Sequence, residues 1–142
     1  MSDIKKSFIQ AFKRKTEKGW NFIYVLVDLH GTILRPCYEG PETYSYYPWA
    51  IETLQEMSKR KDIKVILWSC SYPENLKEHI NRFGRQDVYF DDIGQNRFEL
   101  NTSFQCFDQK PYFNVGLDDK FGFDPEEDWE EIYKLLKEHE ED

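Results

Sequence analysis

The sequence contains too few cysteines for a covalent framework. It has three, Cys37, Cys70 and Cys106, and no two of them have the C-x-x-C spacing. An odd number of cysteines without that spacing predicts neither a disulfide framework nor a zinc knuckle. Free thiols are typical of a reducing compartment, so we expect a cytoplasmic protein.

Long apolar runs are also missing. No hydrophobic segment approaches the roughly 20 residues that span a bilayer, and the first residues lack the apolar stretch of a signal peptide. Internal repeats and low-complexity linkers are absent as well. A chain of 142 residues is within the usual length of one domain. We therefore expect a single soluble domain over residues 1–142, without a membrane partner.

Positive charge is in short supply. Lysine and arginine number 19 against 27 acidic residues, which gives a net charge of −8 at pH 7. Such a surface repels a phosphate backbone, so the net charge disfavours nucleic acid as a partner without excluding it. Hydrophobic residues still make up 39% of the chain and aromatic residues 17%, which is enough to predict a packed core rather than disorder.

Helix and strand patterns alternate along the chain. Apolar residues at helical spacing predict helices, and short runs rich in β-branched and aromatic residues predict strands. Alternation of the two predicts an α/β fold, a three-layer sandwich around a mainly parallel, Rossmann-like sheet. The predicted helices are residues 4–18, 48–60, 73–83 and one beginning at 125, and the predicted strands are residues 22–27, 63–68, 88–90 and 112–117.

Polar residues follow three of these predicted strands. Asp28 follows the first strand, Ser69 the second, and Asp118 and Asp119 the fourth. Because the carboxyl ends of parallel strands meet at one edge of a sheet, we expect these residues to share a crevice. Carboxylate oxygens suit a hard cation such as Mg²⁺ better than zinc. Lys110, just before the fourth strand, can offset part of the negative charge.

This arrangement resembles the haloacid dehalogenase superfamily, most of whose members are Mg²⁺-dependent phosphatases that form an aspartyl phosphate. The first motif of that family, DxDx[TV], is seen here as Asp-Leu-His-Gly-Thr at residues 28–32. The second, a strand ending in serine or threonine, matches Ser69, and the third, a basic residue, matches Lys110. The fourth, an acidic pair, matches Asp118 and Asp119. The resemblance implies the family's core, and neither gap between motifs has room for a cap domain.

The resemblance implies a role for each matched residue. Asp28 would be the nucleophile and a Mg²⁺ ligand, and the backbone carbonyl of His30 a second ligand. Asp118 would be a third ligand, with Asp119 acting directly or through water. Residues that hold phosphoryl oxygens would be Thr32, Ser69, Cys70 and Lys110. The resemblance thus predicts a Mg²⁺-dependent phosphomonoester hydrolase, with a phosphorylated substrate of unknown class.

His30 departs from the family pattern, which has a second aspartate that protonates the leaving group and deprotonates the attacking water. Histidine has an unperturbed pKa of about 6.5 and is able to do both, so we expect His30 to be the general acid and base. The alternative is that His30 only fills space. The chain is then a catalytically impaired module that binds Mg²⁺ and phosphate and serves in interaction or regulation. A different C–X cleavage or phosphotransfer is a third possibility.

Other features receive structural interpretations. Residues 33–47 suffice for a short flap, and capless relatives often act on macromolecular phosphates or complete their site by forming a homo-oligomer. Asp91 and Asp92 are expected in a turn after a strand. Cys70 has no matched base, which favours a reduced thiol over a nucleophile. His79 and His139 are expected to be solvated on charged helix faces.

Overall fold

Helices and strands alternate from residue 3 to residue 95, as predicted. The computed structural model describes residues 3–35, 45–69, 73–95, 113–118 and 122–139. No helix within these ranges is both long and apolar enough to cross a membrane. The elements, in chain order, are α1 (Asp3–Lys18), β1 (Ile23–Asp28), α2 (Ala50–Lys59), β2 (Ile63–Ser69), α3 (Pro73–Gly84), β3 (Asp92–Gln95), β4 (Val115–Leu117) and α5 (Asp128–Glu138).

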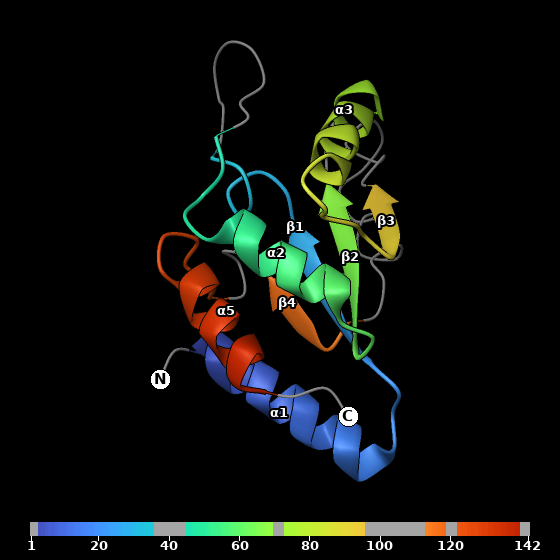
Figure 1. The fold of residues 1–142 in the computed structure, drawn as a ribbon, viewed down its shortest axis with the longest axis vertical. Helices are drawn as coiled ribbons and strands as arrows, with labels where there is room; N and C mark the ends of the chain where they lie inside the picture. Colours follow the sequence, from blue (N-terminus) through green and yellow to red (C-terminus); the bar gives the residue numbers. More distant parts are fainter. Residues whose placement is uncertain (1–2, 36–44, 70–72, 96–112, 119–121, 140–142) are drawn as a thin grey trace, which may run out of the picture.

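The strands form one four-stranded parallel sheet in the order β3-β2-β1-β4. Strand β1 pairs with β2 along its whole length, from Ile23 opposite Ile63 to Asp28 opposite Trp68. Helices α2 and α3 form the crossovers between successive parallel strands. The arrowheads of β1, β2 and β3 accordingly point to the same end of the molecule (Figure 1). An open parallel sheet with helical crossovers is a Rossmann-like α/β architecture, which confirms the predicted fold class at this level.

Helices α1, α2 and α5 pack together against this sheet. The crossovers through α2 and α3 step in the same direction along the sheet, and right-handed crossovers then place both helices on one face. Helix α5 packs beside α2, and α1 packs beside α5 (Figure 1). Most of the connection between β3 and β4 lies outside the described residues. A helical layer of α1, α2 and α5 is therefore established, the handedness rule places α3 on the face of α2, and the predicted third layer stays a prediction.

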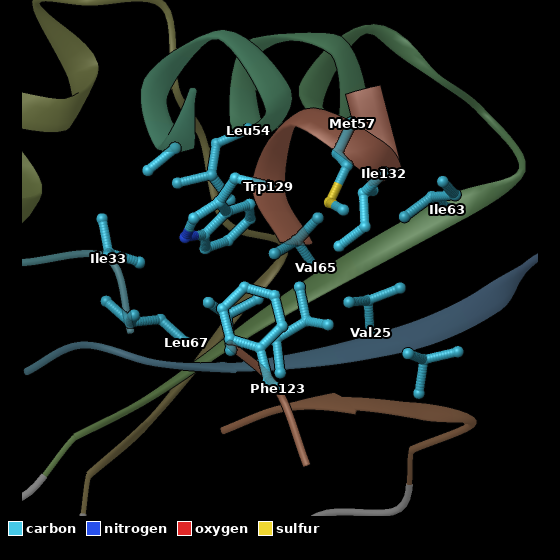
Figure 2. Packing of buried hydrophobic residues seen from close by; sticks show 14 of the residues in the cluster. Val25, Ile33, Leu54, Met57, Ile63, Val65, Leu67, Phe123, Trp129 and Ile132 are labelled. Atoms are coloured by element: carbon cyan, nitrogen blue, oxygen red, sulfur yellow. The ribbon is translucent and has the colours of Figure 1, made fainter. Parts of the chain in front are cut away.

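The hydrophobic core lies between the sheet and α2 and α5 (Figure 2). Leu54 and Met57 on α2, and Trp129, Ile132 and Leu136 on α5, are at most 2% exposed. Their spacing of three or four residues places them on one face of each helix, as the sequence pattern predicts. Full burial of side chains of this size stabilises a fold by about 1.5–3 kcal/mol each.

The third strand differs from its prediction. Residues 88–90 are not a strand, and β3 begins at Asp92, which the sequence had suggested for a turn. Val88 is buried because it closes the end of α3, where its N–H donates to the carbonyl of Phe83 at 3.0 Å. Asp91 instead extends the sheet: its carboxylate accepts the N–H of Val65 at 2.7 Å. Of residues 88–90 only Val88 is buried, and the strand forms beside them.

Three element boundaries also move inward. Helix α2 begins at Ala50 rather than at Pro48, because Trp49 has a left-handed backbone, with φ of 67°. Strand β4 covers Val115–Leu117, half of the predicted run. Helix α5 begins at Asp128, after a turn in which the N–H of Asp128 donates to the carbonyl of Asp124 at 2.8 Å. Helix α1 agrees with its prediction to within one residue.

Candidate functional site

The parallel register brings two of the predicted acidic residues to neighbouring strand ends. Strands β1 and β4 pair from Val25 opposite Val115 to Val27 opposite Leu117. The next residue on each strand is an aspartate, Asp28 or Asp118, and both are partly exposed. Adjacent strands lie about 4.8 Å apart, so the backbones of these residues are close although 90 positions separate them in the chain. The backbones of Asp28 and Asp118 are thus neighbours, and their meeting in one crevice stays a prediction.

Ser69 ends the strand on the other side of β1. Asp28 pairs with Trp68, so Ser69 lies one residue beyond Asp28 at the same edge of the sheet. The strand ends that carry Asp28, Asp118 and Ser69 are therefore side by side, with Asp28 in the middle. The remaining predicted residues lie outside the described parts of the chain, and their roles stay predictions: Cys70, Lys110 and Asp119, together with the side chain of Ser69.

A tight turn follows Asp28. The carbonyl of Leu29 accepts the N–H groups of Ile33 at 2.9 Å and Leu34 at 3.0 Å. The N–H of Gly31 donates to the carbonyl of Leu34 at 2.7 Å. Gly31 has a φ of 82°, a conformation that glycine adopts without steric cost and other residues rarely do. The sequence Gly-Thr therefore forms the tight turn expected of it.

Thr32 lies inside this turn rather than on its surface. It is completely buried, and its carbonyl accepts the indole N–H of Trp129 at 2.8 Å. Its hydroxyl has no hydrogen-bond partner among the residues that the structure describes. The observed contact of Thr32 is thus an anchoring one through its backbone. Its predicted contact with phosphate stays a prediction.

His30 lies beside a second histidine that the sequence interpretation had placed in solvent. The ring centroids of His30 and His79 are 5.6 Å apart, with an interplanar angle of 81°. His79, on α3, is 1% exposed, so the expectation of a solvated side chain was wrong. The signal was present in the sequence, since Leu76, His79 and Phe83 share one helical stripe. His139 is also not simply solvated, because its ring stacks on Phe12 at 4.0 Å.

The predicted short flap has a paired stem. Arg35 donates its N–H to the carbonyl of Ser45 at 2.8 Å, and Tyr47 donates to Ile33 at 3.0 Å. The Arg35 guanidinium forms an ion pair with Glu126 at 2.6 Å, and this hydrogen bond raises the pKa of Arg35. The stem is thereby tied to the chain just before α5. Residues 36–44, which complete the predicted flap, lie outside the described ranges.

The donor atoms at this edge suit a hard divalent cation. Asp28 and Asp118 offer carboxylates, and the backbone of His30 offers a carbonyl oxygen. Mg²⁺ takes oxygen ligands, commonly one or two carboxylates with several waters. Within the described ranges no cluster of three or more His, Cys, Asp and Glu side chains could hold a metal ion. Asp28, Asp118 and the carbonyl of His30 are thus candidate oxygen ligands, and the predicted Mg²⁺ site stays a prediction.

A surface hollow lies at the opposite end of the sheet. Its volume is about 440 Å³, and its lining includes Trp20, Phe22, Tyr24 and Asn114. Tyr24 precedes Asp28 by four strand residues, which corresponds to roughly 13 Å along β1. The hollow therefore belongs to a different part of the molecule from the two carboxylates.

Comparison with known proteins supports the architecture. A solved structure, described as that of a conserved protein from Bacteroides thetaiotaomicron, is similar to this chain with a TM-score of 0.60 and 28% sequence identity. The match covers 83% of this chain and 92% of that protein. No protein-family model and no curated protein matches the chain. Since the description of the similar structure names no ligand or reaction, the functional argument rests on the residues of this chain.

Proposed function

We propose that this protein is a Mg²⁺-dependent phosphomonoesterase that works through a phosphorylated Asp28. The observation that carries the proposal is the register of β1 and β4, which makes Asp28 and Asp118 neighbours at the carboxyl edge of the sheet. The tight turn after Asp28 and the resemblance of residues 28–32 to the haloacid dehalogenase motif support it.

Electrostatics at the two aspartates favours a bound cation. Two negative carboxylates on adjacent strands repel each other. A divalent cation held there would relieve this repulsion and, with phosphate bound, would neutralise charge on the phosphoryl oxygens. Asp28 and Asp118 would hold the ion together with the carbonyl of His30. Asp119, Lys110 and Ser69 are the candidates to complete the site.

The reaction takes two displacement steps at phosphorus. A carboxylate oxygen of Asp28 forms a bond to phosphorus while the ester P–O bond breaks, and the leaving oxygen takes a proton from His30. Water then attacks the phosphorylated Asp28 and gives its proton to His30. The second step breaks the bond between phosphorus and Asp28, which releases inorganic phosphate and restores both residues.

The proposal is tested by offering the purified protein a panel of phosphomonoesters with Mg²⁺ or with EDTA. We expect release of inorganic phosphate from at least one compound, with Mg²⁺ required. Panel members should range from small sugar phosphates and nucleotides to phosphopeptides and phosphorylated nucleic-acid ends, because neither gap between the motifs has room for a cap domain that would limit substrate size. Binding of Mg²⁺ and phosphate without turnover on any compound would instead support the non-enzymatic module.

His30 is expected to control the rate of this reaction. Replacement by alanine removes the proton donor and should lower kcat by roughly 10²–10⁴-fold, the usual contribution of a general acid or base. Replacement by aspartate should retain part of the activity, with a changed dependence of kcat on pH. Steady-state kinetics between pH 5 and 9 measures both variants. An alanine variant as fast as the wild type would show that His30 only fills space.

A further inference from the structure

Trp129 connects the two halves of the candidate site. It lies in the first turn of α5 and is completely buried. Its indole ring lies among Ile33, Leu54 and Phe123, and its nitrogen points toward the chain at Ile33 (Figure 2). This places a single side chain between the turn that follows β1 and the residues that follow β4.

On the first side, Trp129 holds the turn that carries His30. Its indole N–H donates to the carbonyl of Thr32 at 2.8 Å, and both residues are fully buried. A buried carbonyl that loses its donor pays the cost of desolvation, because water cannot replace the bond. The turn from Asp28 to Thr32 is thereby anchored at its far end to α5.

On the second side, the same indole contacts the segment that follows Asp118. The rings of Trp129 and Phe123 lie edge to face, with centroids 5.0 Å apart. Phe123 is 3% exposed, and its N–H donates to the carbonyl of Asp118 at 3.3 Å. A displacement of the indole would therefore act on the backbone of Asp118 through one intervening residue.

The backbone of Trp129 is held in turn by α2. The Thr53 hydroxyl donates to the carbonyl of Trp129 at 2.8 Å, and Thr53 is completely buried. Three elements distant in sequence thus meet at one residue. We propose that Trp129 is a positioning residue that sets the spacing of the Asp28 and Asp118 segments for Mg²⁺ binding. This inference rests on the proposed function.

The test compares Trp129→Phe with a matched core variant, Phe8→Leu. Phenylalanine keeps an aromatic ring beside Phe123 but removes the N–H that holds Thr32, together with part of the buried ring volume. Residues that orient metal ligands usually contribute 10- to 100-fold to metal affinity, and we expect Mg²⁺ to bind that much more weakly to Trp129→Phe in calorimetry. Phe8 is a fully buried residue of α1, so its replacement perturbs the core and should leave the Mg²⁺ affinity within about twofold.

Hydrogen exchange gives a second readout that needs neither metal nor activity. The amides of Ile33 and Leu34 donate to Leu29 within the turn, and they should exchange at least about tenfold faster in Trp129→Phe than in Phe8→Leu. Thr53→Val, which removes only the hydroxyl, should change both readouts in the same direction by about threefold. If Trp129→Phe does not fold, Thr53→Val serves in its place as the test of the positioning role of Trp129.

The outcomes separate this inference from the proposed function. If the wild type binds Mg²⁺ and Trp129→Phe binds it equally well, with slow exchange of the Ile33 and Leu34 amides, the role of Trp129 alone is overturned. A wild-type protein that binds no Mg²⁺ would overturn the proposed function itself. A positioning residue should affect metal binding more than substrate binding. We therefore expect Trp129→Phe to bind Mg²⁺ more weakly, and its KM for the phosphoester at saturating Mg²⁺ to change less than about twofold.

Discussion

Replacement of Asp28 by asparagine is expected to lower kcat by at least about 10⁴-fold, since removal of a nucleophile abolishes the covalent route. The amide nitrogen and oxygen of asparagine do not form the acyl phosphate. The substitution also removes one of the two negative charges that would hold Mg²⁺. Phosphate release measured on the best substrate of the panel, with wild type and variant at equal concentration, gives the ratio. Mass spectrometry after an acid quench should detect phosphorylated Asp28 only in the wild type.

Asp91→Asn is the matched control for this experiment. Asp91 is a carboxylate on the same sheet, beside β2, where it accepts the N–H of Val65 at 2.7 Å and lies 3.7 Å from the Lys64 amine. Asparagine can still accept that hydrogen bond, so kcat should stay within about twofold of the wild-type value. Turnover that survives in Asp28→Asn, or that falls equally in both variants, would show that Asp28 is not the nucleophile.

Replacement of Arg60 by methionine is expected to lower the free energy of unfolding by about 3–5 kcal/mol, because it leaves a buried charge without its partner. The Arg60 guanidinium forms two hydrogen bonds with the Asp62 carboxylate, at 2.8 and 2.7 Å. It also donates to the carbonyls of Leu136 and His139, at 3.0 and 2.9 Å, near the end of α5. Arg60 and Asp62 are 9% and 3% exposed, so water replaces these contacts poorly.

Arg82→Met provides the matched control for the Arg60 variant. Arg82 pairs with Glu78 at 3.1 Å on the surface of α3, where the two side chains are 41% and 42% exposed. Exposed pairs of this kind contribute at most about 0.5 kcal/mol, so urea denaturation should separate the two variants clearly. Adding Asp62→Leu to Arg60→Met should recover part of the loss, since the unpaired carboxylate is then gone. Equal losses in Arg60→Met and Arg82→Met would contradict this account.

Local patterns in the sequence were sufficient to predict the elements that position the candidate site. The apolar run before Asp28, the stripe on α2 and the stripe on α5 each report burial through their own periodicity. The alternation of these elements predicts a parallel sheet. A parallel sheet in turn predicts that Asp28 and Asp118 lie at the same edge, as their backbones do. These inferences succeeded because they depend on neighbours within about ten residues and on one rule of topology.

Inferences about short or polar segments were less successful for a physical reason. The apolar side chain of Val88 is buried where the chain closes the end of α3. The strand that follows, Asp92–Gln95, has a single large apolar residue, so its sequence gives little hydrophobic signal. His79 was assigned to solvent from its charged neighbours, although its place on the stripe of Leu76 and Phe83 buries it beside His30. In both cases the prediction relied on the chemical type of the residue, whereas tertiary contacts decided where the residue lies.

The sequence by itself determined the α/β class, the strand that ends at Asp28 and the glycine turn that follows it, because these depend on local periodicity and backbone preference. Tertiary structure alone decided that Trp129 holds Thr32 across 97 positions, and that Thr53 reaches Trp129 across 76. It also brought His79 to His30. Such contacts join residues that are far apart in the sequence, and the local sequence around one residue does not predict the other. They form only because α2, α3 and α5 pack on the sheet.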